Sequence, residues 1–115
     1  MDSILKRVAD KIIPSGNTSL FVYVDAIEVI NICKEMKCKI LGIDSLQLYE
    51  SGGVRPYMEF SVDYSSPYNY PNSDEKGFWE EAIVFIAKVH TIHPEFIFEI
   101  VYDKSQIKTA PRKNS

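Results

Sequence analysis

The strongest constraint on the fold is a change of hydrophobic period between residues 25 and 63. Up to about Met36, apolar residues recur at helical spacing, in a stripe of Ala26, Val29, Ile30, Cys33 and Met36. Residues 39–50 and 57–64 then have the composition of strands, with Gly52-Gly53 between them. A period of 3.6 residues buries one face of a helix, and glycines supply the positive φ angles of tight hairpin turns. The stretch therefore predicts a helix followed by a β-hairpin, which is a fold of the α+β class.

The flanking segments extend this unit to the order α-α-β-β-α-β. Residues 3–13 and 74–92 carry apolar residues at helical spacing, and residues 95–102 alternate as a strand does. Residues 18–24 fit either a strand or a helix from Ser19, and the clustering of apolar side chains favours the helix. A right-handed crossover brings the last strand beside the first, which predicts a small three-stranded, mainly antiparallel sheet in the order 2-1-3, packed against the helices.

The two strands of the hairpin differ in their patterns. Leu41 and Ile43 share one parity and Leu46 and Leu48 the other, so a regular strand cannot bury all four on one face. Either both faces are covered, or a bulge lies near residues 44–45. The strand at 57–64 alternates cleanly and predicts one buried and one wet face. Its wet face carries Tyr57, Glu59, Ser61 and Asp63.

Length and composition indicate one domain at residues 1–103, followed by a loose basic tail at 104–115. The start of the chain has mixed charges and lacks the apolar run of a signal peptide, and no segment reaches the length of a membrane span. Cys33 lies on the apolar stripe, so a buried free thiol is expected rather than a disulfide. These features predict a cytoplasmic protein.

Charge is unevenly distributed along the chain. Residues 42–81 hold eight acidic and two basic side chains, whereas the chain as a whole has a net charge of −3. Such a block repels phosphates, so it disfavours nucleic acid and anionic membranes, and we expect neither as a partner. It suits a basic partner, and the alternative is an ordinary solvated face.

No residue pattern indicates catalysis. His90 and His93 are one helical turn apart but have no further ligand at metal-binding spacing, and Cys33 lies on an apolar stripe. Asp44 and Asp63 form a carboxylate pair only across a small sheet, which rarely supplies the cleft that hydrolysis needs. We therefore expect a non-enzyme that needs no cofactor and no metal.

What remains is a tyrosine-rich, acidic surface. Five of the seven tyrosines lie between residues 49 and 70, interleaved with carboxylates. Tyrosine offers a large contact area with a polar tip, and carboxylates orient a basic partner. The alternative is that some of these tyrosines are core residues and the others decorate a loop. The predicted partner-binding residues are Asp44, Tyr57, Glu59, Ser61, Asp63, Tyr68, Tyr70 and Asp74.

Residues 26–44, AIEVINICKEMKCKILGID, resemble one bacterial family, the polymorphic-toxin immunity proteins called immunity protein 40. That family pairs a helix of this kind with an Ile-Leu-Gly-Gly-Asp strand. Ile40, Leu41, Gly42 and Asp44 match it, and Ile43 stands in place of the second glycine. Residues 58–64, 78–86 with Trp79, and 96–102 are similar to its later aromatic strand, tryptophan-containing helix and closing strand.

The resemblance implies a cytosolic antidote that binds a secreted toxin domain and blocks it. Many such toxins are nucleases with basic grooves, which an acidic, tyrosine-rich face would complement. The partner would be the cognate toxin domain, and the chain a monomer or weak homodimer. Two alternatives stay open: a small metal-binding accessory protein or enzyme that uses His90 and His93, and a structural subunit that associates with itself through an open strand edge.

Overall fold

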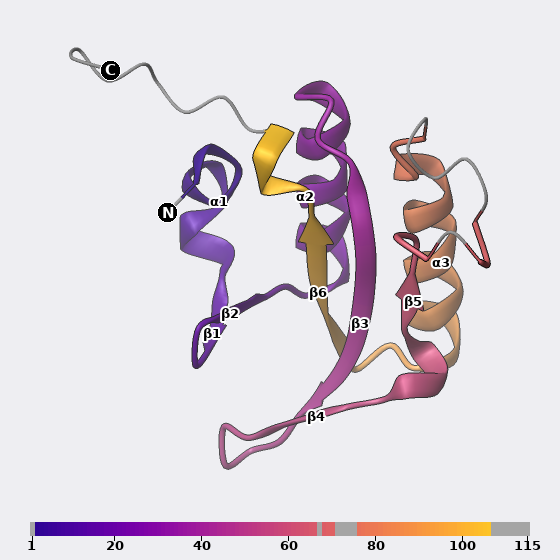
Figure 1. Cartoon of the computed structure of the whole chain (residues 1–115). Helices are drawn as coiled ribbons and strands as arrows, with labels where there is room; N and C mark the ends of the chain where they lie inside the picture. Colours follow the sequence, from indigo (N-terminus) through magenta and orange to yellow (C-terminus); the bar gives the residue numbers. More distant parts are fainter. Residues whose placement is uncertain (1, 67, 71–75, 107–115) are drawn as a thin grey trace.

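The computed structural model describes residues 2–66, 68–70 and 76–106, and its central element is β3 (Ile40–Leu48). β3 pairs with β6 (Phe96–Tyr102) on one side and with β4 (Val54–Pro56) and β5 (Val62–Asp63) on the other. All three pairings are antiparallel. The result is a four-stranded sheet with β3 in its interior (Figure 1).

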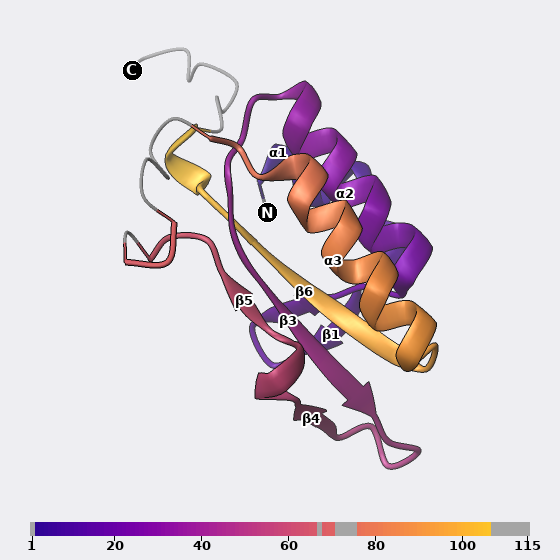
Figure 2. The same cartoon turned by 90° about the vertical axis from the view of Figure 1, so that its right-hand side faces the viewer.

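Two helices, α2 (Tyr23–Glu35) and α3 (Trp79–Ile92), lie side by side over one face of this sheet (Figure 2). We call this the inner face and the opposite one the outer face. The main core lies between the helices and the inner face. Its largest fully buried side chains include Phe21, Ile30, Ile40, Ile43, Ile86 and Phe98. The α+β class, with helices packed on an antiparallel sheet, is therefore confirmed.

The β3 strand contains a bulge, which accounts for its irregular alternation. Its register against β6 shifts between Ile40, which pairs with Tyr102, and Gly42, which pairs with Val101. Because one residue is inserted there, Ile40 and Ile43 both belong to the inner core despite their opposite parity. Leu46 lies on the outer face, in a second small core with Leu20 and Ile97. Both faces are thus covered, and the expected bulge at residues 44–45 lies instead near Leu41.

The N-terminal segment differs from its prediction as one helix over residues 3–13. The helix α1 (Ser3–Arg7) is capped by the Asp2 carboxylate, which accepts from the N–H of Leu5 at 2.8 Å. A short 3₁₀ turn (Ala9–Lys11) follows, and then a hairpin of β1 (Ile13–Ser15) and β2 (Thr18–Leu20). Ile13 packs against the small outer core, and this tertiary contact outweighs the helical spacing of the apolar residues that precede it.

The prediction of a helix from Ser19 was wrong, because this segment pairs with β1 and β6 instead. After β2, Phe21 exchanges two backbone hydrogen bonds of 2.8 Å with Phe98 on the free side of β6. Phe21 is 2% exposed. The chain therefore stays extended until Val22, and α2 begins at Tyr23.

The strand predicted at residues 57–64 is interrupted. Leu46 pairs with Pro56 and Ile43 with Val62, so three steps along β3 face six steps along the partner. The surplus forms a 3₁₀ turn, η2 (Met58–Phe60), between β4 and β5. Met58, expected on the buried face, is 78% exposed as a result. The main sheet consequently has four strands, and β1 and β2 form a separate two-stranded sheet. The prediction of a single sheet with three strands in the order 2-1-3 is corrected accordingly.

The helix predicted at residues 74–92 is described from Trp79, and residues 74 and 75 lie outside the described part of the chain. Gly77 is required just before it, since a Cβ there would lie 2.3 Å from the Trp79 indole. Of the predicted tail, residues 104–106 form a 3₁₀ turn, η4 (Lys104–Gln106), and residues 107–115 are outside the description. Among the described helices, none is long and apolar enough to cross a membrane.

Candidate functional site

Three carboxylates lie together on the outer face, one from each of three neighbouring strands. Asp44 of β3 is directly opposite Glu99 of β6. Asp63 of β5 is opposite Gly42, one step along the same face from Asp44. Directly paired side chains are neighbours on a sheet, and residues two apart on one strand share a face. We call Asp44, Asp63 and Glu99 the three-acid patch.

Glu99 is the member of the patch whose carboxyl pKa is raised. Partial burial raises the pKa of its carboxyl, and the negative charge of Asp44 and a hydrogen bond with Asp44 raise it further. Lys104 lies close enough to lower the pKa of Glu99 in part. The two strands therefore hold two carboxyl groups close together in a position that disfavours their simultaneous ionisation.

Asp63 behaves in the opposite way. Its Oδ1 accepts hydrogen bonds from the Ser65 hydroxyl at 2.5 Å and from the Ser65 N–H at 2.9 Å. These bonds lower the pKa of the Asp63 carboxyl. Asp63 is exposed. It therefore presents a fixed negative charge to solvent beside the Asp44–Glu99 pair.

Gly42 allows β5 to reach this face. A Cβ on Gly42 would lie 2.8 Å from the carbonyl oxygen of Val62, closer than side chains tolerate. The next position, where the resembling family has its second glycine, holds Ile43, which is 1% exposed in the main core. The two positions thus serve different needs: Gly42 admits the neighbouring strand, and Ile43 fills the inner face.

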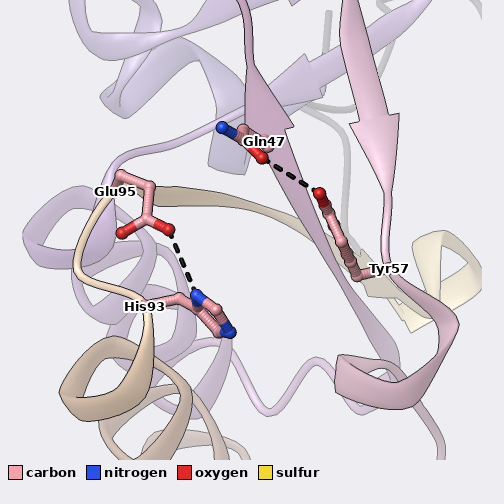
Figure 3. A network of polar contacts seen from close by, with 4 residues as sticks. All are labelled: Gln47, Tyr57, His93 and Glu95. Carbon is pink, nitrogen blue, oxygen red and sulfur yellow. Dashed lines mark hydrogen bonds and ion pairs between the residues drawn. The ribbon is translucent and has the colours of Figure 1, made fainter.

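Tyr57, a predicted binding residue, turns away from the patch. Its hydroxyl donates to Gln47 Oε1 at 3.0 Å, as Figure 3 shows, and its ring stacks on Phe96 with centroids 4.9 Å apart. Arg55 lies over the same ring at 5.2 Å. Since Phe96 belongs to the inner core, Tyr57 is half-buried at the end of the inner face.

The other predicted binding residues are scattered. Glu59 is exposed on η2, and the half-buried Ser61 donates its hydroxyl to the Tyr57 carbonyl at 3.2 Å. Tyr68 is 92% exposed. Tyr70 packs inward, edge-on to Tyr64 at 5.3 Å. Asp74 lies outside the described residues. The structure therefore brings Asp44 and Asp63 together but separates both from Tyr57.

The two histidines have different neighbours. His90 stacks on Tyr23 with ring centroids 4.0 Å apart. His93 stacks on Phe96 at 4.3 Å, and its Nδ1 lies 3.1 Å from Glu95 Oε1 (Figure 3). In the part of the chain that the structure describes, no three His, Cys, Asp or Glu residues are grouped as metal ligands. Aromatic packing accounts for the placement of both rings.

An apolar groove lies on the other side of β5 from the patch. It encloses about 430 Å³ between β5 and α3. Val62, Tyr64, Tyr70, Val84 and Phe85 form its walls, with Glu80, Glu81 and Lys88 as its charged lining. Burial raises the pKa of the Tyr64 hydroxyl, with smaller effects from Tyr70 and Glu81. A partner that reached over the short β5 strand would contact both the groove and the patch.

Sequence reasoning missed Glu99. It lies between Ile97 and Val101, which alternation placed on the less buried face of the last strand. That alternation indicates the face of Glu99, but only the register of β6 against β3 shows that it meets Asp44.

A comparison with known protein families gives no match for this chain. A comparison with curated proteins gives no relative.

Proposed function

We propose that this chain is an immunity protein that binds and neutralises a cognate secreted toxin domain in the cytoplasm. The three-acid patch is its contact for a basic surface of that toxin. The observation that carries this proposal is the convergence of Asp44, Asp63 and Glu99 on a sheet face that neither α2 nor α3 covers.

Electrostatics give the patch a preference for a cation. Burial, and then the negative charge of Asp44, raise the pKa of Glu99, so its ionised form is disfavoured at this position. A lysine or arginine from a partner would offset this repulsion and would gain charge-assisted hydrogen bonds. Exposed Asp63 adds a further negative charge beside this pair, which favours rapid association with a basic partner.

The nature of the partner follows from the same charges and from the resemblance to immunity protein 40. A nuclease toxin needs a basic groove for its phosphate substrate, and an acidic antidote face complements such a groove. Colicin nucleases and their immunity proteins are among the tightest protein pairs, so very high affinity is attainable in a complex of this kind.

We place the activity in binding and not in catalysis. The His90 and His93 rings are packed against aromatic neighbours, so neither is free to act as a catalytic base. The exposed, acidic and partly apolar surface around β5 is suited to a protein partner.

The test uses the full chain as bait in lysate of its source cell. The patch variant carries Asp44→Asn, Asp63→Asn and Glu99→Gln, and the matched control carries Asp10→Asn, Glu35→Gln and Glu50→Gln. Both variants lose three carboxylates, but the control loses exposed ones that lie outside the patch. Proteins that remain bound are identified by mass spectrometry.

We expect the wild-type chain and the control to retain the same protein, which has a basic toxin-like domain, and the patch variant to lose it. Equal retention by the patch variant would refute the patch as the contact. Recovery of the bait alone, from cells shown to make such a toxin, would favour self-association over the antidote function.

A further inference from the structure

The end of α2 is a Schellman motif that brings two cysteines together. The N–H of Cys38 donates to the carbonyl of Cys33 at 2.7 Å, and the N–H of Lys37 donates to that of Lys34 at 3.1 Å. Lys37 has a φ of 56°, the left-handed conformation that this motif requires. A side-chain contact between the motif's first and last residues accompanies this geometry, and here those residues are Cys33 and Cys38.

The two thiols are in contact within the main core. Both cysteines are 0% exposed and belong to the same core cluster, where the contact that accompanies a Schellman motif brings their side chains together. They are the only cysteines of the chain. A disulfide needs two cysteines whose backbones are close and whose side chains point toward each other. The Schellman motif supplies the first condition and the thiol contact supplies the second.

The pair is chemically asymmetric. The hydrogen bond with Cys38, together with burial, raises the pKa of the Cys33 thiol. The same hydrogen bond, donated by Cys33, lowers the pKa of Cys38. The thiolate is the form of cysteine that attacks oxidants. Cys38 is therefore the attacking sulfur, and Cys33 is placed to resolve the product.

We propose that Cys33 and Cys38 form a redox modification site, which a small peroxide converts into an intramolecular disulfide. The Cys38 thiolate attacks one peroxide oxygen, the O–O bond breaks, and Cys38 becomes a sulfenic acid. The hydroxide that leaves takes up the proton that the Cys38 thiol had released and becomes the first water. The Cys33 sulfur then attacks Cys38, the S–O bond breaks, and hydroxide leaves with the Cys33 proton as a second water. Two thiols are thus oxidised by two electrons, and one peroxide is reduced to two waters.

The site lies where three elements are joined. The Cys38 carbonyl accepts from Trp79 Nε1 of α3 at 2.8 Å, and the Cys38 thiol donates to the Asp103 carbonyl after β6 at 3.2 Å. Forming the disulfide removes the thiol that donates to the Asp103 carbonyl. Trp79 is the only tryptophan of the chain, so its fluorescence reports on the state of the pair.

The experiment treats the folded full-length chain with hydrogen peroxide and follows intact mass, free thiols and Trp79 emission. We expect the mass to fall by two hydrogen atoms and the thiol count after unfolding to drop from two to zero. Emission of Trp79 changes in step, and dithiothreitol reverses all three readings. These measurements need no variant, so they decide the proposal even if a cysteine substitution disturbs the fold.

The control is Cys33→Ala, which keeps the attacking sulfur and removes the resolving one. In this variant the chain gains one oxygen, and dimedone traps the sulfenic acid on Cys38. The proposal is overturned if wild-type chains resist peroxide while folded, accumulate dimedone-reactive sulfenic acid, or form disulfide-linked dimers instead of the internal bond.

Discussion

Gly42→Ala tests how β5, and with it Asp63, is held against β3. The new Cβ would lie 2.8 Å from the Val62 carbonyl oxygen, whereas contacts shorter than 3.4 Å force the neighbour to move. The neighbour is backbone, so β5 has to shift as a unit. Overpacking of this kind reduces the free energy of unfolding by about 1–3 kcal/mol. Only two residue pairs join β5 to β3, so we expect the strand to detach locally.

Chemical denaturation measures the loss of stability, and hydrogen exchange of the Tyr64 amide measures the detachment. That amide donates to the Leu41 carbonyl at 2.8 Å, and Tyr64 is 3% exposed, so it is protected in the wild type. Gly53→Ala is the matched control. Its new Cβ meets only the Ser51 hydroxyl at 3.7 Å, and we expect a change within about 0.5 kcal/mol. A Gly42→Ala variant as stable as the control, with Tyr64 still protected, would refute the close approach of β5 to Gly42 as the reason for this glycine.

Three further predictions concern the end of α2, the patch and the core. Lys37→Gly relieves a left-handed conformation that costs a non-glycine residue about 1–2 kcal/mol, and the flexibility of glycine offsets part of this, so thermal unfolding should show a gain of about 0.5–1 kcal/mol. Lys37→Ala, which loses the same charge but keeps the strain, should show no such gain. Glu99→Gln should flatten the pH dependence of stability. The raised pKa of Glu99 stabilises the folded state below the ordinary glutamate value, and this contribution is lost as pH rises through the raised pKa. The variant should therefore gain most over wild type at neutral pH, and a constant difference across pH would contradict the assignment. Ser45→Ala removes a buried hydroxyl that has no hydrogen-bond partner among the described residues, so denaturation should show a gain of about 1 kcal/mol, and a loss of that size would reveal a missed partner.

Local sequence patterns predicted the helix α2 and the unusual strand β3. The stripe Ala26, Val29, Ile30 and Cys33 is buried in α2 as its 3.6-residue period predicts. The irregular parity of β3 correctly indicated an unusual strand, since a bulge and coverage of both faces are each present. The central position of β3 also agrees with its run of apolar residues of both parities.

These patterns could not predict the register between strands that lie far apart in the sequence. The alternation from Tyr57 to Tyr64 is regular, but β4 and β5 pair with β3 in different registers, and the extra residues between them form η2. For the same reason Tyr57 was placed beside Asp63, although its ring packs on Phe96. Glu99 was missed because its proximity to Asp44 exists only in the β3–β6 pairing. The acidic character of the site was thus predictable, and its geometry was not.

The most direct test of the antidote function is growth rescue. Cells produce the toxin-like domain retained in the bait experiment, together with the wild-type chain, the patch variant or the matched control. We predict that the wild type and the control restore growth and that the patch variant, although folded and equally abundant, does not. Equal rescue by the patch variant would show that the three-acid patch is not the contact, and growth arrest with the wild-type chain present would contradict the antidote function itself.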